Sequence, residues 1–126
     1  METKKREIVK NYVLSYNNFD IEGMTKYLAK NIVFENISNG KVNLKTEGLE
    51  AFKEQATIAK EYFKQREQNI ESWEIQDSTI TIEISYKAIL AIDLPNGLKI
   101  GDTLELKGVS HFEFENGKIK RITDKS

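Results

Sequence analysis

The sequence has no cysteine, only one histidine and no long apolar run. Without cysteine there is no disulfide framework, no thiolate nucleophile and no zinc site built on thiolates. A single histidine argues against a serine–histidine–acid triad. No apolar segment approaches the length of about 18 residues that a membrane-spanning helix needs, so we expect no membrane partner.

Net charge is almost absent as well. The 19 Lys and Arg residues against 20 Asp and Glu residues give a formal charge of −1 at pH 7. A nucleic-acid-binding protein presents a basic face, so we expect no nucleic-acid partner. The carboxylates form no cluster of the kind that holds a metal ion, and we expect neither metal nor cofactor. The opening residues, METKKREIVKN, are too polar for the core of a signal peptide, and we expect a cytoplasmic protein.

What is present is typical of one globular domain. The chain has 126 residues, of which 39% are hydrophobic and 31% charged, enough to bury a core as a single domain over residues 1–126. Residues 79–94 and 103–114 alternate apolar and polar side chains with the period of two that indicates strands. Pro95, Gly97 and Gly101 lie between these stretches, so we predict a long antiparallel hairpin.

The rest of the chain supplies helices and shorter strands. Apolar residues recur at helical spacing over residues 3–17 and 49–64, and Asp20 is placed to cap a second, short helix that ends at Asn31. Strands are predicted at residues 32–36, 42–46, 68–76 and 118–123. Helices first and an antiparallel meander last predict an α+β fold, with the helices packed on one face of a curved sheet.

Strand parity indicates which side chains of the final hairpin face the helices. One face of the second hairpin strand is mostly apolar and must be the inner one; it carries Leu104, Leu106, Gly108, Ser110, Phe112 and Phe114. Ser110 is a polar residue on this face and needs a partner, either protein, water or ligand. His111 has the opposite parity, so we expect it on the outer surface or at a dimer contact.

Several short motifs together resemble a known superfamily. In chain order they are Tyr12, then Asp20-Ile21-Glu22 with Tyr27-Leu28, then IVFEN at 32–36, TEGLEAF at 46–52 and the closing hairpin at 112–119. Their order resembles the nuclear transport factor 2-like superfamily, which includes ketosteroid isomerases and SnoaL-type polyketide cyclases. The resemblance implies a cone-shaped, cystatin-like roll: a strongly curved, mostly antiparallel sheet wraps the N-terminal helices, and a pocket opens between them. It also implies pairing through the outer sheet face, as in many members.

The resemblance further implies roles for single residues. The isomerases have a helix tyrosine that donates to the substrate carbonyl, and Tyr12 stands at that position; the alternative is a core tyrosine. Where they have an aspartate base, this chain has Asn36, which cannot take a proton. Asn36 either orients a ligand or bonds its own turn. Ser110 stands where they have a protonated aspartate, and is a weaker donor.

The missing base has one candidate replacement in the sequence. Glu71 shares the parity of Trp73 and Ile75 and so points inward if the strand is regular. Burial there would raise its pKa toward that of a working base. The alternative is an irregular strand before Trp73, with Glu71 in solvent.

Three functions remain open from the sequence. The first is binding of a small apolar or amphipathic molecule, with Asn36 and Ser110 as polar anchors and aromatic walls made by Tyr16, Phe34, Phe52, Trp73, Tyr86 and Phe112. The second is an isomerase, cyclase or dehydratase that uses Tyr12 as electrophile and a base such as Glu71. The third is an interaction module with a filled core that forms a homodimer through the outer sheet face.

Overall fold

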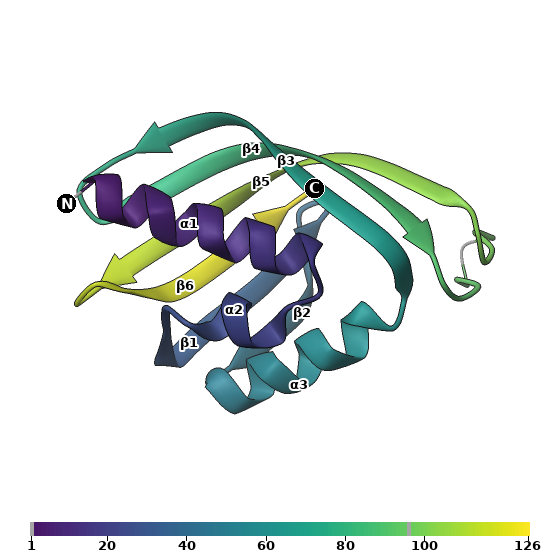
Figure 1. Cartoon of the computed structure of the whole chain (residues 1–126), viewed down its shortest axis with the longest axis horizontal. Coiled ribbons are helices and arrows are strands. Elements are labelled where there is room, and N and C mark those ends of the chain that lie inside the picture. Colours follow the sequence, from purple (N-terminus) through teal and green to yellow (C-terminus); the bar gives the residue numbers. More distant parts are fainter. Residues whose placement is uncertain (1, 96) are drawn as a thin grey trace.

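The computed structural model describes residues 2–95 and 97–126, in which three helices precede or interrupt a six-stranded sheet (Figure 1). In chain order the elements are α1 (Glu2–Asn17), α2 (Ile21–Thr25), β1 (Leu28–Ser38), β2 (Lys41–Glu47), α3 (Leu49–Lys60), β3 (Phe63–Ile75), β4 (Thr79–Leu90), β5 (Thr103–Glu115) and β6 (Lys118–Lys125). No helix in this described part is long and apolar enough to cross a bilayer.

The strands form one curved sheet in the order β2-β1-β6-β5-β4-β3. Neighbouring strands are antiparallel except β1 and β6, which run parallel. Figure 1 shows the sheet arching over α1, with α2 and α3 on the same concave side. This arrangement confirms the predicted α+β fold with helices wrapped by a mostly antiparallel sheet.

The core lies between α1 and the middle of the sheet. Val9 and Val13 of α1 are buried, as the helical spacing predicts, and Ile8 is buried beside them. The inner face of β4 and β5 packs in the same cluster through Ile80, Ile82, Ile84, Phe112 and Phe114. The period-two prediction is therefore confirmed where helices cover the sheet. Farther along β5 the same face runs past the helices, and Leu106 is 46% exposed (Figure 1).

Several boundaries differ from the prediction. The second helix ends at Thr25 and not at Asn31, because the next residues join the sheet: Leu28 pairs with Ile119 of β6. The third helix ends at Lys60, and β3 begins at Phe63, five residues before the predicted start. β4 ends at Leu90 and not at residue 94, and residues 91–95 belong to the loop before β5.

Asp20 caps α2 as predicted, since its carboxylate accepts the Gly23 amide at 3.0 Å. Asp20→Ala is expected to lower the free energy of unfolding by about 1 kcal/mol, because the amide loses its partner. Chemical denaturation measures this loss. The matched control is Asp20→Asn, which keeps an accepting oxygen and should stay within a few tenths of a kcal/mol of the parent. Equal losses in both variants would contradict the capping role.

Candidate functional site

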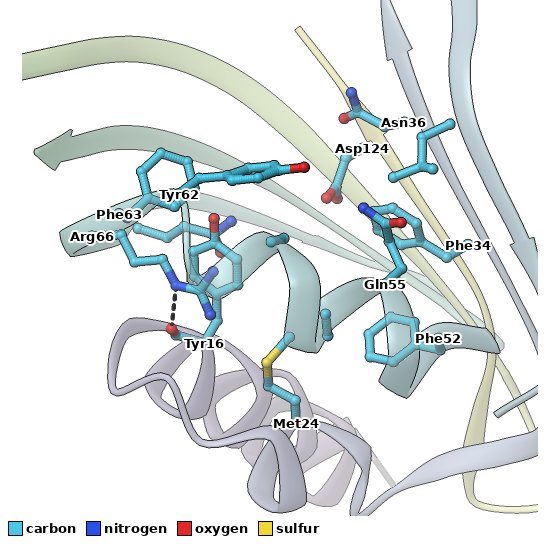
Figure 2. Close-up of a pocket in the computed structure, with 14 residues that line it drawn as sticks. Tyr16, Met24, Phe34, Asn36, Phe52, Gln55, Tyr62, Phe63, Arg66 and Asp124 are labelled. Carbon is cyan, nitrogen blue, oxygen red and sulfur yellow. Dashed lines mark hydrogen bonds between the residues drawn. The ribbon is translucent and has the colours of Figure 1, made fainter. Parts of the chain in front are cut away.

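A cavity of about 300 Å³ opens between the helices and the concave side of the sheet (Figure 2). Aromatic and aliphatic side chains make most of its wall, and three side-chain amides and two charged groups complete it: Tyr16, Met24, Phe34, Asn36, Leu44, Phe52, Gln55, Ala56, Ala59, Tyr62, Phe63, Arg66, Gln68 and Asp124. A second hollow of about 280 Å³ lies toward β5 and shares Tyr16, Asn36, Phe63, Gln68 and Asp124 with the first. Asp124 therefore stands where the two spaces adjoin.

Asp124 comes from the last strand and points inward. It shares the parity of Ile122, which is fully buried, and it lies opposite Ser110 of β5 and beside Asn36 of β1. The Ser110 hydroxyl donates to its Oδ1 at 2.7 Å. The residue as a whole is half-buried because part of its surface faces the cavity. Removal of its carboxyl from water raises the pKa of Asp124 to about 6, although the Ser110 hydrogen bond acts in the opposite direction.

Arg66 enters the cavity wall from β3 and is only 4% exposed. Its Nε donates to the Tyr16 carbonyl at 2.8 Å, and its guanidinium stacks on the Tyr16 ring, 3.7 Å from the centroid, with Phe19 at 4.5 Å. The rings stabilise the buried cation through their π-faces. Its Nη2 is buried without a hydrogen-bond partner, and no carboxylate pairs with Arg66 anywhere in the described residues.

A pair of tyrosines lies next to Arg66. The hydroxyls of Tyr16 and Tyr86 share a hydrogen bond of 3.0 Å. Burial raises the pKa of both phenols, and the neighbouring Arg66 charge lowers that of Tyr16 in part. Because the Tyr16 hydroxyl donates to Tyr86, the Tyr86 hydroxyl, which lines the second hollow, keeps its own proton free to donate to a ligand.

Six of the predicted ligand-binding residues line one or both of these spaces. Tyr16, Phe34, Asn36 and Phe52 line the main cavity, and Tyr86 and Ser110 line the second hollow. Figure 2 shows Asn36 on the same side as Asp124, with Tyr16 and Arg66 across the cavity. The Asn36 amide donates to Asn43 Oδ1 at 2.8 Å, which fixes its orientation at the rim.

Two predicted wall residues, Trp73 and Phe112, line neither of these two spaces. Phe112 is 1% exposed and fills the core instead of bordering the hollow. Trp73 packs against the edge of the core and lines neither space. The guanidinium carbon of Arg6 lies 4.9 Å from the centroid of the Trp73 ring.

Tyr12 belongs to the core rather than to the cavity wall. Its ring meets Phe112 edge-on at 5.7 Å and Phe52 at 6.5 Å between centroids. Burial raises its pKa, and the nearby Asp124 charge raises it further. The sequence alternative of a packed tyrosine therefore describes its position, and the electrophile role has no support from the cavity wall.

The prediction that Glu71 points inward is wrong. The β3–β4 register shifts between Ile70 and Ser72, which leaves Glu71 as an extra, unpaired residue, and its side chain is exposed. The bulge changes the parity, so Trp73 no longer predicts the direction of Glu71. His111 lies on the outer face as predicted, where its Nδ1 and the Thr81 hydroxyl are 2.6 Å apart.

Asp124 and Arg66 are the two charged residues of the cavity wall, and the sequence prediction did not include them. A sequence signal for Asp124 does exist. If the last strand is extended by two residues, from residue 123 to Lys125, Asp124 has the same parity as Ile122 and is predicted to face inward. No sequence pattern indicates that Arg66 faces the cavity, because the sequence predicts the end of a helix and a loop over residues 61–67. In the described residues, no group of three or more His, Cys, Asp or Glu side chains could hold a metal ion.

Comparisons with known proteins agree with this architecture. A model of the SnoaL-like domain family matches residues 9–122. No curated protein sequence matches significantly. Among solved structures, the fold is similar to that of a proposed polyketide cyclase from Xanthomonas campestris pv. campestris, with a TM-score of 0.83, 18% identity, and coverage of 99% of this chain and 91% of that chain.

Two further solved structures share the fold. A proposed SnoaL-like polyketide cyclase from Jannaschia sp. CCS1 gives a TM-score of 0.83 at 13% identity, covering 98% of this chain and 85% of that chain. An LEH-like epoxide hydrolase from M. tuberculosis gives a TM-score of 0.78 at 15% identity, covering 98% of this chain and 83% of that chain. At such identities the likeness concerns the fold, and the chemistry must be argued from the side chains of this chain.

Proposed function

Because the chain belongs to the SnoaL-like domain family, we propose that it is an enzyme that transfers a proton within a small, largely apolar carbonyl compound, with Asp124 as the acid–base group. The observation that carries the proposal is the Asp124 carboxyl, which lines a mostly apolar cavity and accepts a hydrogen bond from Ser110; burial raises its pKa to about 6. A general base works best when its pKa lies near the working pH.

The cavity offers groups for each part of such a reaction. Asp124 takes a proton from the carbon beside the carbonyl, and the electrons of that C–H bond form a carbon–carbon double bond while the carbonyl oxygen becomes negative. The free hydroxyl of Tyr86, in the second hollow that adjoins the cavity at Asp124, donates to that oxygen. Protonated Asp124 then returns the proton to another atom of the substrate, so that no co-reactant is needed.

A carrier that binds without chemistry is the second candidate. The mostly apolar wall with a few polar groups is typical of ligand pockets in general and supports this function as well as the first. What favours the enzyme is the carboxyl: a carrier gains nothing from an acid whose charged form is destabilised by burial.

Solvent exchange tests the proposal without knowledge of the physiological substrate. A panel of ketones and lactones is incubated with the protein in deuterium oxide, and NMR measures loss of the carbon-bound proton beside the carbonyl. We expect exchange above that of buffer for at least one compound, with a rate that rises with pH through about 6 as Asp124 ionises. Binding of panel members without any exchange would instead support the carrier.

Ser110→Ala is expected to move this pH profile upward. The Ser110 hydrogen bond stabilises the charged carboxylate, so its loss raises the pKa of Asp124 above about 6 and the rate reaches half its maximum at higher pH. The matched control is Ser72→Ala. The Ser72 hydroxyl makes the same kind of bond, 2.6 Å to Glu83, but on the exposed side of the sheet. An unshifted profile in Ser110→Ala would show that Asp124 is not the titrating group.

A further inference from the structure

The Arg66 charge has no counter-charge in the described structure. A buried ionic group normally has a paired partner or a full set of hydrogen bonds, because its removal from water costs several kcal/mol. Arg66 has a backbone hydrogen bond from Nε, a side-chain hydrogen bond with Tyr16 that lowers the pKa of that phenol, and two aromatic faces, while Nη2 has no partner. A positive charge held in this way at a cavity wall attracts an anion more strongly than it would in water.

Asp124 is the other charged residue of the cavity wall, and it does not neutralise Arg66. In the described residues, no hydrogen bond or salt bridge joins the two side chains: Asp124 accepts from Ser110, and Arg66 donates to the Tyr16 carbonyl. Figure 2 places the two side chains on different sides of the cavity, with Arg66 against Tyr16 and Asp124 near Asn36. The space between them is bounded by apolar side chains such as Phe34 and Phe52.

We infer that the ligand of this cavity is an organic acid with an apolar body, whose carboxylate lies toward Arg66 while its body extends toward Asp124. This inference deepens the proposed function and rests on it for the role of Asp124 at the far end of the ligand. A carboxylate supplies the missing counter-charge and two acceptor oxygens for the guanidinium. The apolar walls accept the body.

A matched pair of probes tests the preference for an anion. The probes are 2-naphthoate and 2-naphthamide, which share one apolar ring system and differ in charge. Affinities are measured by NMR titration at about pH 5, where the Asp124 carboxyl is protonated and the probe carboxylate is ionised. We expect the wild-type protein to bind the acid at least about tenfold more tightly than the amide.

Substitutions locate the preference at Arg66. Arg66→Met removes the charge and keeps an apolar stem, so it should abolish the preference for the acid and leave the amide affinity within about twofold. Arg66→Lys keeps a charge without the planar fork and should retain a reduced preference. The control is Arg6→Met: Arg6 also stacks on an aromatic ring, that of Trp73, but does not line the cavity. It should keep the full preference.

Each outcome decides the question. Equal affinities for the two probes in the wild-type protein, no binding of the acid, or a preference that survives Arg66→Met would overturn the inference. If Arg66→Met does not fold, the wild-type probe pair and Arg66→Lys decide it. Loss of solvent exchange with the acid preference intact would refute the proposed function alone, and exchange without the preference would refute the anion site alone.

Discussion

Asp124→Asn should lower the rate of solvent proton exchange by about 10²–10⁴-fold, the usual contribution of a positioned general base. The asparagine oxygen still accepts the Ser110 hydroxyl, so the local geometry is preserved, but an amide cannot take up a proton. Affinity for a neutral probe such as 2-naphthamide should stay within about threefold, because the substituted atoms are similar in size and polarity. The loss should therefore appear in the rate and not in binding.

The matched control for this result is Glu71→Gln, which also converts a carboxylate to an amide. Glu71 is exposed and lies outside the cavity, so the variant should exchange protons at the wild-type rate. Equal rates for wild type and Asp124→Asn would remove the proposed chemistry and leave the cavity as a binding site. A loss in Glu71→Gln as large as that in Asp124→Asn would restore the prediction made from strand parity alone.

The fold was predictable because burial of one sheet face constrains every side chain on the strand. A one-residue slip of β4 or β5 would send Ile82 and Phe112 into solvent and Glu83 and His111 into the core. The alternation therefore determined that Ser110 faces inward and His111 outward, as the structure shows. Alternation is a weaker guide on β3, because a bulge at Glu71 changes the parity of the strand. No sequence pattern predicts this bulge.

The site was only partly predictable. Strand parity predicts which face of the sheet a side chain is on, but not whether that side chain is packed in the core or lines a cavity. Phe112 and Ser110 are on the same face of β5, yet the first fills the core against Tyr12 and the second borders a hollow. Whether a residue on this face packs in the core or lines a hollow depends on how α1 covers that part of the sheet, and this contact joins segments far apart in the sequence. Asp124 was missed for a different reason: strand ends are the least certain part of a sequence prediction, and β6 continues to Lys125.

The carboxyl that supports catalysis should also reduce stability, and Asp124→Asn should therefore be more stable than the wild type at high pH. Burial raises the pKa of Asp124 from 3.8 to about 6 in the folded state. Below about pH 4 both folded and unfolded chains hold the proton, and the acid carries no charge penalty. As the pH rises from about 4 to 6, the unfolded chain ionises first, so the folded state loses stability; above about 6 the deficit is constant.

The size of this effect follows from the shift itself. A rise from 3.8 to about 6 corresponds to about 3 kcal/mol of lost stability on the high-pH side. Denaturant titrations of both proteins at about pH 3 and about pH 8 measure the difference, with the low-pH pair as internal reference for any effect of the substitution on packing. We expect the advantage of Asp124→Asn to appear only at the higher pH, with a gain in melting temperature of roughly 10 °C there. A difference independent of pH would mean that the carboxyl is well solvated, and a solvated acid would have neither the raised pKa nor the acid–base role that depends on it.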